Sequence, residues 1–215
     1  MIKKFLSTLI LTAALTIILT NHTYADEISN KIINVALILD TSGGKFSEPE
    51  KVYQTFQNSI DKIFKKEPQF NIIPIDETDP YIQIYREENN LMIGVDDDYT
   101  QTNNKDLSLK KKDIEAIGKY FKADYIVYAR VTTTEPRFAD GVFSVSKKIN
   151  ITLDFRIWSD KKADFVYARR AMKTGSSTSI YLGAGSASHA VERGLKKCLQ
   201  DIEKNSDKIK TSMIS

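Results

Sequence analysis

The chain of 215 residues is long enough for one domain with its own hydrophobic core. Its hydrophobic content of 41% excludes a chain that is disordered over its whole length. Its formal net charge is only +3, from 31 basic and 28 acidic residues, and the basic run at residues 110–112 is short. Because neutralising phosphates requires a clustered basic excess, nucleic acid is not an expected partner.

The first 25 residues contain the three parts of a secretory signal peptide. Lys3 and Lys4 give a positive start, residues 5–19 are largely apolar, and Ala25 is the small residue that a signal peptidase requires. We expect cleavage after Ala25, which removes two lysines and lowers the formal charge from +3 to +1. The alternative is an uncleaved anchor, but the apolar run is shorter than the roughly 20 residues that span a bilayer. No later stretch predicts a transmembrane span, so the mature chain is expected in the periplasm or outside the cell.

The single cysteine, Cys198, limits the covalent chemistry of an exported chain. One cysteine cannot form an internal disulfide, so packing must stabilise the fold. No cysteine lies near the cleavage point, so a bacterial lipid anchor is not expected. Cys198 lies on the apolar stripe of a predicted helix, which favours a buried structural thiol over an intermolecular disulfide or a reactive thiol.

The first elements of the mature chain predict a strand followed by a helix. Residues 31–40 form a nearly continuous apolar run, typical of a strand buried on both faces, and residues 41–44 form a turn. Ser47 begins a capping box, and apolar residues then recur at helical spacing until about Lys66.

The next segment predicts a second strand at residues 70–75, and Pro74 near its end indicates a sheet edge or a strand terminus. Asp79 can open a short helix, and residues 94–106 are polar and rich in turn formers, which indicates a loop. A further helix begins at Ser108 and leads directly into a strand at residues 125–131.

The second half of the mature chain predicts a long hairpin. After a connector at residues 132–141, apolar and polar residues alternate over 143–157, and residues 165–174 return as the antiparallel partner. A Gly/Ser-rich loop at 175–188 then leads to a last helix with its apolar stripe between 191 and 202.

This order of elements predicts the α/β class, of the mixed α+β kind. We expect a mixed β-sheet of about five strands with a long hairpin in the C-terminal half, and helices packed mainly on one face. Residues 26–205 form the expected single domain, after the signal peptide at 1–25, and residues 206–215 form a polar tail that frays.

Two segments have carboxylates that suggest a cation site. The turn after the first predicted strand resembles the Asp-x-Ser-x-Ser metal-binding turn of von Willebrand A domains, with Asp40 and Ser42 as ligands, although Gly44 replaces the second serine. A turn that needs glycines for its backbone conformation explains the same residues. Asp96 and Asp98 could hold a hard cation, but they lack the spacing of an EF-hand, and a solvated loop is favoured.

No motif predicts catalysis or a cofactor. His189 is the only histidine of the expected mature chain, which excludes a multi-histidine zinc site and gives no support for a Ser-His-Asp site. The Gly/Ser segment at 182–188 lacks the lysine of a P-loop and the third glycine of a dinucleotide fingerprint. We therefore expect no catalytic residue and no cofactor.

One stretch has the pattern of a known group of bacterial domains. Gly118-Lys119, at the end of a helix, is followed by Ala123-Asp124-Tyr125 at the start of a strand. This unit resembles small envelope domains: the N-terminal domain of the TolB translocation protein, the curli-secretion lipoprotein, and outer-membrane activators of peptidoglycan synthases. The resemblance implies a compact α/β domain that acts by binding other proteins. It carries over no functional residues, because these families share a scaffold and not a site.

Together these features predict an exported, non-enzymatic envelope protein that acts through protein–protein interaction. The hairpin offers an edge for strand addition, and Tyr81, Tyr85 and Tyr99 are candidate contact residues. One alternative is a domain that binds a divalent cation or small ligand through the turn of Asp40 and Ser42, and another is an enzyme with a carboxylate site assembled in space. The partner and the oligomeric state are left open by the sequence.

Overall fold

The computed structural model describes residues 32–43, 46–64, 67–76, 78–91, 108–140, 144–180 and 186–214. The predicted signal peptide with its cleavage after Ala25, and the candidate ligands Asp96 and Asp98, lie outside these residues.

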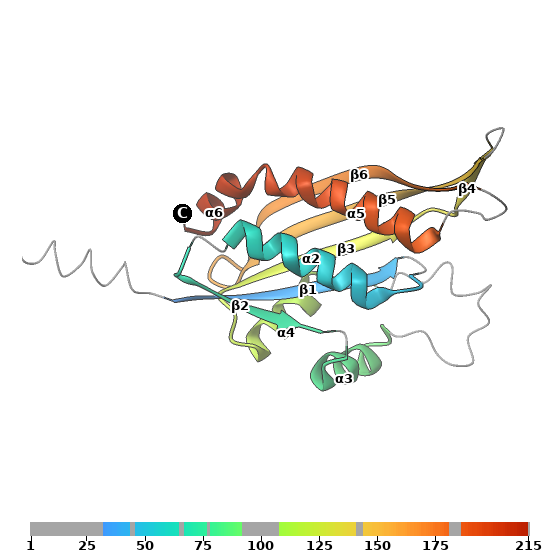
Figure 1. Ribbon diagram of the computed structural model, residues 1–215. Helices are drawn as coiled ribbons and strands as arrows, with labels where there is room; N and C mark the ends of the chain where they lie inside the picture. Colours follow the sequence, from blue (N-terminus) through green and yellow to red (C-terminus); the bar gives the residue numbers. More distant parts are fainter. Residues whose placement is uncertain are drawn as a thin grey trace, which may run out of the picture.

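One mixed sheet of six strands forms the centre of the fold (Figure 1). β1 pairs in parallel with β2 and β3, whereas β5 pairs antiparallel with β3, β4 and β6. β3 and β4 pair with successive parts of β5, and β6 pairs with its whole length from the other side. The strands are β1 (Ile33–Gly43), β2 (Phe70–Ile75), β3 (Tyr125–Thr133), β4 (Arg137–Asp140), β5 (Ser144–Ser159) and β6 (Asp164–Ile180).

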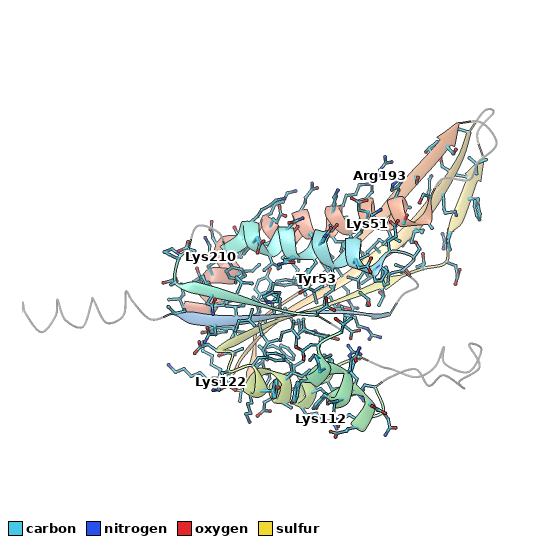
Figure 2. All side chains as sticks on the ribbon, turned by 60° about the horizontal axis from the view of Figure 1, so that its bottom comes forward. Lys51, Tyr53, Lys112, Lys122, Arg193 and Lys210 are labelled. Atoms are coloured by element: carbon cyan, nitrogen blue, oxygen red, sulfur yellow. The ribbon has the colours of Figure 1, made fainter. Side chains whose placement is uncertain are left out.

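Helices lie on both faces of the sheet, the two longest on the same one (Figure 1). α2 and α5 pack there together with α6, which confirms the prediction of a mixed sheet with helices mainly on one face. The shorter α3 and α4 lie on the opposite face. Figure 2 shows Lys51 and Arg193 on the α2 and α5 side, and Lys112 and Lys122 on the α4 side. The helices are α2 (Pro49–Phe64), α3 (Pro80–Glu88), α4 (Lys111–Tyr120), α5 (Ala187–Glu203) and α6 (Ser206–Ile214).

The larger core lies between the sheet and α2, α5 and α6. The alternation predicted along β5 is confirmed, because the apolar residues of one parity are buried under α5. α5 contributes its apolar stripe to the same core, including Cys198. The buried residues of β5 on this face are Ile149, Ile151, Leu153, Phe155 and Ile157.

A smaller core lies on the opposite face, under α3 and α4. It contains the residues of alternate parity on the central strands, among them Ile38 of β1 and Tyr128 of β3, together with Trp158 of β5. α3 contributes Ile82 and α4 contributes Ile117. The central strands are therefore buried on both faces, as the continuous apolar run of β1 predicts.

The expected connector at 132–141 is partly a strand. β3 continues to Thr133, and β4 pairs with residues 145–148 of β5. A strand of four residues directly after Pro136 is too short for alternation to reveal it, and pairing with β5 is what stabilises it.

The Gly/Ser-rich loop expected at 175–188 is also corrected. β6 continues to Ile180, and its second half pairs with the first residues of β5. The small residues serve close packing there, since a Cβ on Gly175 would overlap the carbonyl oxygen of Ala190 on α5. Low strand propensity is outweighed by this tertiary contact.

The polar tail expected at 206–215 is helical over most of its length. α6 covers Ser206–Ile214, and its two buried residues, Ile209 and Met213, belong to the larger core. The Tyr125 hydroxyl donates a hydrogen bond to the carbonyl of Met213. Lys210 pairs with Glu67 at 3.0 Å, which ties the segment to the body of the protein.

Candidate functional site

The topology of the parallel strands marks one position in the sheet. α2 connects β1 to β2 on one face, and α3 and α4 connect β2 to β3 across the other face. The direction of winding therefore changes between β1 and β3. In open α/β sheets, ligands bind beyond the carboxyl ends of the strands at such a switch point. Asp40 of β1 lies near this end, with Arg130 of β3 as its neighbour in the register.

Asp40 has no exposed surface. The hydroxyl of Tyr128 donates a hydrogen bond to its Oδ2 atom at 2.7 Å, and Nη2 of Arg86 lies 3.8 Å from its Oδ1 atom. Arg86 comes from α3, and about 10% of its side chain is exposed. A buried carboxylate requires such a donor and such a counter-charge, because burial without them is costly.

The pKa of Tyr128 lies well above the ordinary tyrosine value, chiefly because the side chain is buried and also because it faces the Asp40 carboxylate. The positive charges of Arg86 and Arg130 oppose this shift only in part. Tyr128 therefore keeps its proton and donates its hydrogen bond to Asp40 over the whole physiological pH range.

Charges of alternating sign cross the sheet in one row. Asp40 of β1, Arg130 of β3, Asp154 of β5 and Arg170 of β6 are successive partners in the strand register. Nε of Arg170 lies 2.5 Å from Oδ1 of Asp154, and its Nη2 lies 3.1 Å from Oδ2, so this ion pair is bidentate. Opposite charges on adjacent strands stabilise the pairing. The row begins in the buried cluster at Asp40 and ends on the exposed hairpin.

α3 is held in place by a second polar contact, which positions Arg86. The hydroxyl of Tyr85 donates to Oδ1 of Asp113 on α4 at 2.9 Å, and Asp113 also accepts from the backbone of Lys110. Burial is the main reason why the pKa of Tyr85 is raised, and the hydrogen bond to Asp113 adds to it. Tyr81 stacks on Tyr120 at 3.6 Å between ring centroids.

These contacts give two of the three candidate contact tyrosines a packing role. Tyr81 and Tyr85 hold α3 against α4, and Tyr120, which the sequence did not single out, is the more exposed aromatic residue at 56%. Tyr99 lies outside the described residues.

The predicted cation ligands are only partly described. Asp40 uses its carboxylate for Tyr128 and Arg86, Ser42 lies in β1 without a described side chain, and Asp96 and Asp98 lie outside the described residues. Across the described part of the chain, no group of three or more His, Cys, Asp or Glu residues is placed to hold a metal ion. A cation at Asp40 would lie beside the Arg86 guanidinium and would be repelled by it.

The remaining side chains that could react, Cys198 and His189, lie in positions that indicate structural roles. Cys198 is buried in α5, as expected, and burial raises the pKa of its thiol to about 11. A thiol with this pKa is a poor nucleophile at neutral pH. His189 is exposed in the first turn of α5, where its backbone N–H donates to the Ser186 hydroxyl that caps the helix.

A second candidate site is the outer edge of the long hairpin. β6 has 17 residues and pairs with β5 alone among the described strands. Side chains of α5 already occupy part of it, since Lys197 donates to the carbonyl of Thr174 and Arg193 to that of Ser176, both at 3.0 Å. In residues 168–173 of β6, the Met172 side chain is 66% exposed.

Sequence reasoning found Asp40 but not the residues around it. Arg86 lies on a short helix with a weak pattern, and Tyr128 lies in an apolar run that predicts a core strand. The one available signal was Arg130, a charged residue at the end of that apolar run. No sequence pattern predicts that these residues contact Asp40, which is 88 residues from Tyr128.

No protein-family model and no curated protein matches the sequence. Solved structures with some likeness include the hypothetical protein CT253 from Chlamydia trachomatis, with 12% identity, 86% of this chain and 98% of that chain covered, and a TM-score of 0.42. Lipoprotein GNA1162 from Neisseria meningitidis has 10% identity, coverage of 80% and 99%, and a TM-score of 0.38. The LpoB C-terminal domain from Salmonella enterica has 9% identity, coverage of 66% and 83%, and a TM-score of 0.33.

The solved structures with some likeness thus include bacterial lipoproteins, but these identities and TM-scores assign the chain to no family. The resemblance to TolB and to the curli-secretion lipoprotein stays a prediction. None of the described helices has the length and apolar character needed to cross a membrane.

Proposed function

We propose that this protein is an exported, non-enzymatic protein of the bacterial envelope that binds an extended segment of another protein along the edge of β6. The observation that carries the proposal is the 17-residue edge strand, which has one partner strand among the described residues. Away from Thr174 and Ser176, whose carbonyls accept from α5 side chains, such an edge offers backbone donors and acceptors in a row, and an added strand completes them. Export is supported by the predicted signal peptide at residues 1–25.

The charges along β6 favour a partner other than a second copy. Arg169, Arg170 and Lys173 lie within five consecutive residues of the edge strand. Arg169 pairs with Asp201 and Arg170 with Asp154, which leaves Lys173 without an ion pair among the described residues. Two copies paired antiparallel about Lys173 would bring two such cations together, which is unfavourable. An extended segment with a carboxylate side chain would instead complement Lys173.

Site-specific photocrosslinking in the native host tests this proposal. A photoreactive amino acid at Met172, on β6, is expected to form a covalent adduct with an envelope protein. The same group at Ile84, which is 54% exposed on α3, is the matched control and should give no such adduct. Reversing the charge with Lys173→Glu, which breaks no ion pair among the described residues, should weaken the adduct at position 172. Equal labelling from both positions, or none from position 172, would contradict the proposal.

Export is tested separately on the purified mature protein. Its N-terminal sequence is expected to begin at Asp26, immediately after the predicted cleavage. A mature chain that retains residues 1–25 would contradict export by a cleaved signal peptide.

A further inference from the structure

The guanidinium of Arg86 has fewer partners than its burial requires. An arginine side chain offers five N–H donors. The described residues give Arg86 one ion pair, to Asp40 at 3.8 Å, which is longer than a hydrogen bond. Its Nε atom is buried and has no hydrogen-bond partner in the described part of the chain. Because a buried donor without an acceptor is costly, the arrangement indicates that an acceptor is missing.

Arg86 lies at the position where the topology of the sheet predicts a ligand. Arg86 meets Asp40 near the carboxyl end of β1, beside the switch point between β1 and β3. About 10% of the side chain is exposed, so the cluster is not sealed from solvent. Two independent observations, the unsatisfied donor and the topology, therefore point to the same position.

The chemistry of the unsatisfied donor decides which kind of ligand fits. Asp40 already accepts a hydrogen bond from the Tyr128 hydroxyl, and the buried Nε–H of Arg86 needs a further acceptor. A guanidinium fork matches the oxygens of a carboxylate or a phosphate. A divalent cation would be repelled at the same position.

We propose that Arg86 binds an oxyanion, the carboxylate or phosphate group of a small ligand, beside Asp40 and Tyr128 at the switch point of the sheet. Asp40 and Tyr128 position the guanidinium, and the oxyanion accepts hydrogen bonds from it. This site is separate from the edge of β6 and does not depend on the protein-binding function proposed above.

Calorimetric titration and thermal unfolding with two probes, sodium phosphate and sodium succinate, test the site. Sodium chloride at equal ionic strength is the reference, because general salt effects act on both sides of the comparison. A saturable rise in Tm is expected with at least one probe, since a ligand that binds the folded state stabilises it. Phosphate alone would identify a phosphorylated ligand, and succinate alone a carboxylic acid.

Three variants distinguish an oxyanion site at Arg86 from a cation site at Asp40 and from anion binding elsewhere on the surface. Arg86→Gln should weaken binding about tenfold or more, the loss expected for charge-assisted hydrogen bonds. Arg137→Gln, which removes an exposed cation from β4, is the matched control and should bind like the parent protein. Asp40→Asn removes a negative charge from the site, so oxyanion binding should be kept or strengthened, whereas a cation site would be lost.

Arg86→Gln removes a positive charge beside the buried Asp40 and could unfold the protein. The double variant Asp40→Asn with Arg86→Gln removes the buried negative charge as well, and it too should lose the response. The proposal is overturned if neither probe gives a saturable effect or if the folded Arg86 variants bind like the parent. It is also overturned if Mg²⁺ stabilises the parent protein and Asp40→Asn abolishes that effect.

Discussion

Gly175 on β6 and Gly194 on α5 set the distance between the hairpin and the helix that covers it. A Cβ on Gly175 would overlap the Ala190 carbonyl oxygen and lie 2.7 Å from the backbone nitrogen of Gly194. A Cβ on Gly194 would lie 2.5 Å from Cγ1 of Ile151. Around Gly175 backbone therefore meets backbone, and no flexible side chain there could move aside.

We predict that Gly175→Ala lowers the free energy of unfolding by about 1–3 kcal/mol, because the extra methyl group forces the helix away from the strand. Gly118→Ala on α4 is the matched control. Its Cβ would overlap Cδ1 of Ile126, which must shift, but this atom is the far end of a side chain and not backbone. Alanine is also the better helix former. Urea denaturation of both variants measures the difference, and an equal cost for the two would contradict this account of the crossing.

At the scale of the element, α6 is a helix that packs on the larger core through few apolar residues. Only Ile209 and Met213 of this short helix are buried, yet both lie in the larger core. Isolated helices of this length are unstable in water, so packing is what stabilises α6. The ion pair of Lys210 with Glu67 adds a partly exposed contact that is worth little by itself.

We predict that Ile209→Ala lowers the free energy of unfolding by about 2–5 kcal/mol, the cost of a large-to-small change in a core. Ile214→Ala, in the same helix but 60% exposed, should change it by less than about 0.5 kcal/mol. Thermal or urea unfolding gives both values. A negligible effect of Ile209→Ala would mean that the segment frays, as its polar composition predicts.

For the whole molecule, the buried tyrosines connect stability to pH. The pKa values of Tyr128 and Tyr85 are raised above the ordinary tyrosine value, mainly by burial. Each group then holds its proton more tightly in the folded than in the unfolded chain. Their contribution to stability is therefore complete below about pH 10 and is lost as the pH rises above it.

We predict that the free energy of unfolding falls between about pH 9.5 and 11.5, a range around the ordinary tyrosine pKa. Tyr128→Phe should reduce the slope of this fall. Phenylalanine cannot ionise, so one source of the pH dependence disappears. Tyr120→Phe, at an exposed ring, is the control and should leave the slope unchanged. Denaturant titrations across this pH range give the slopes, and identical slopes for the parent protein and Tyr128→Phe would refute the assignment.

The local pattern of residues determined the order of the elements other than β4 and α6, the orientation of β5 and the burial of Cys198. Alternation and helical spacing depend on neighbours within a few residues, so they can be recognised in the chain alone. The apolar residues of β5 between 149 and 157 face the larger core as this pattern predicts. β2 is an edge strand, which is one of the two positions that Pro74 indicated.

Tertiary structure alone decided the surroundings of Asp40, the strand nature of β4 and the packing of α6. Tyr128 is 88 residues from Asp40, and Arg86 reaches it from a helix on one face of the sheet. β4 exists because β5 pairs with it, and α6 because the larger core has room for Ile209 and Met213. These outcomes depend on contacts between distant parts of the chain, and local periodicity contains no information about such contacts.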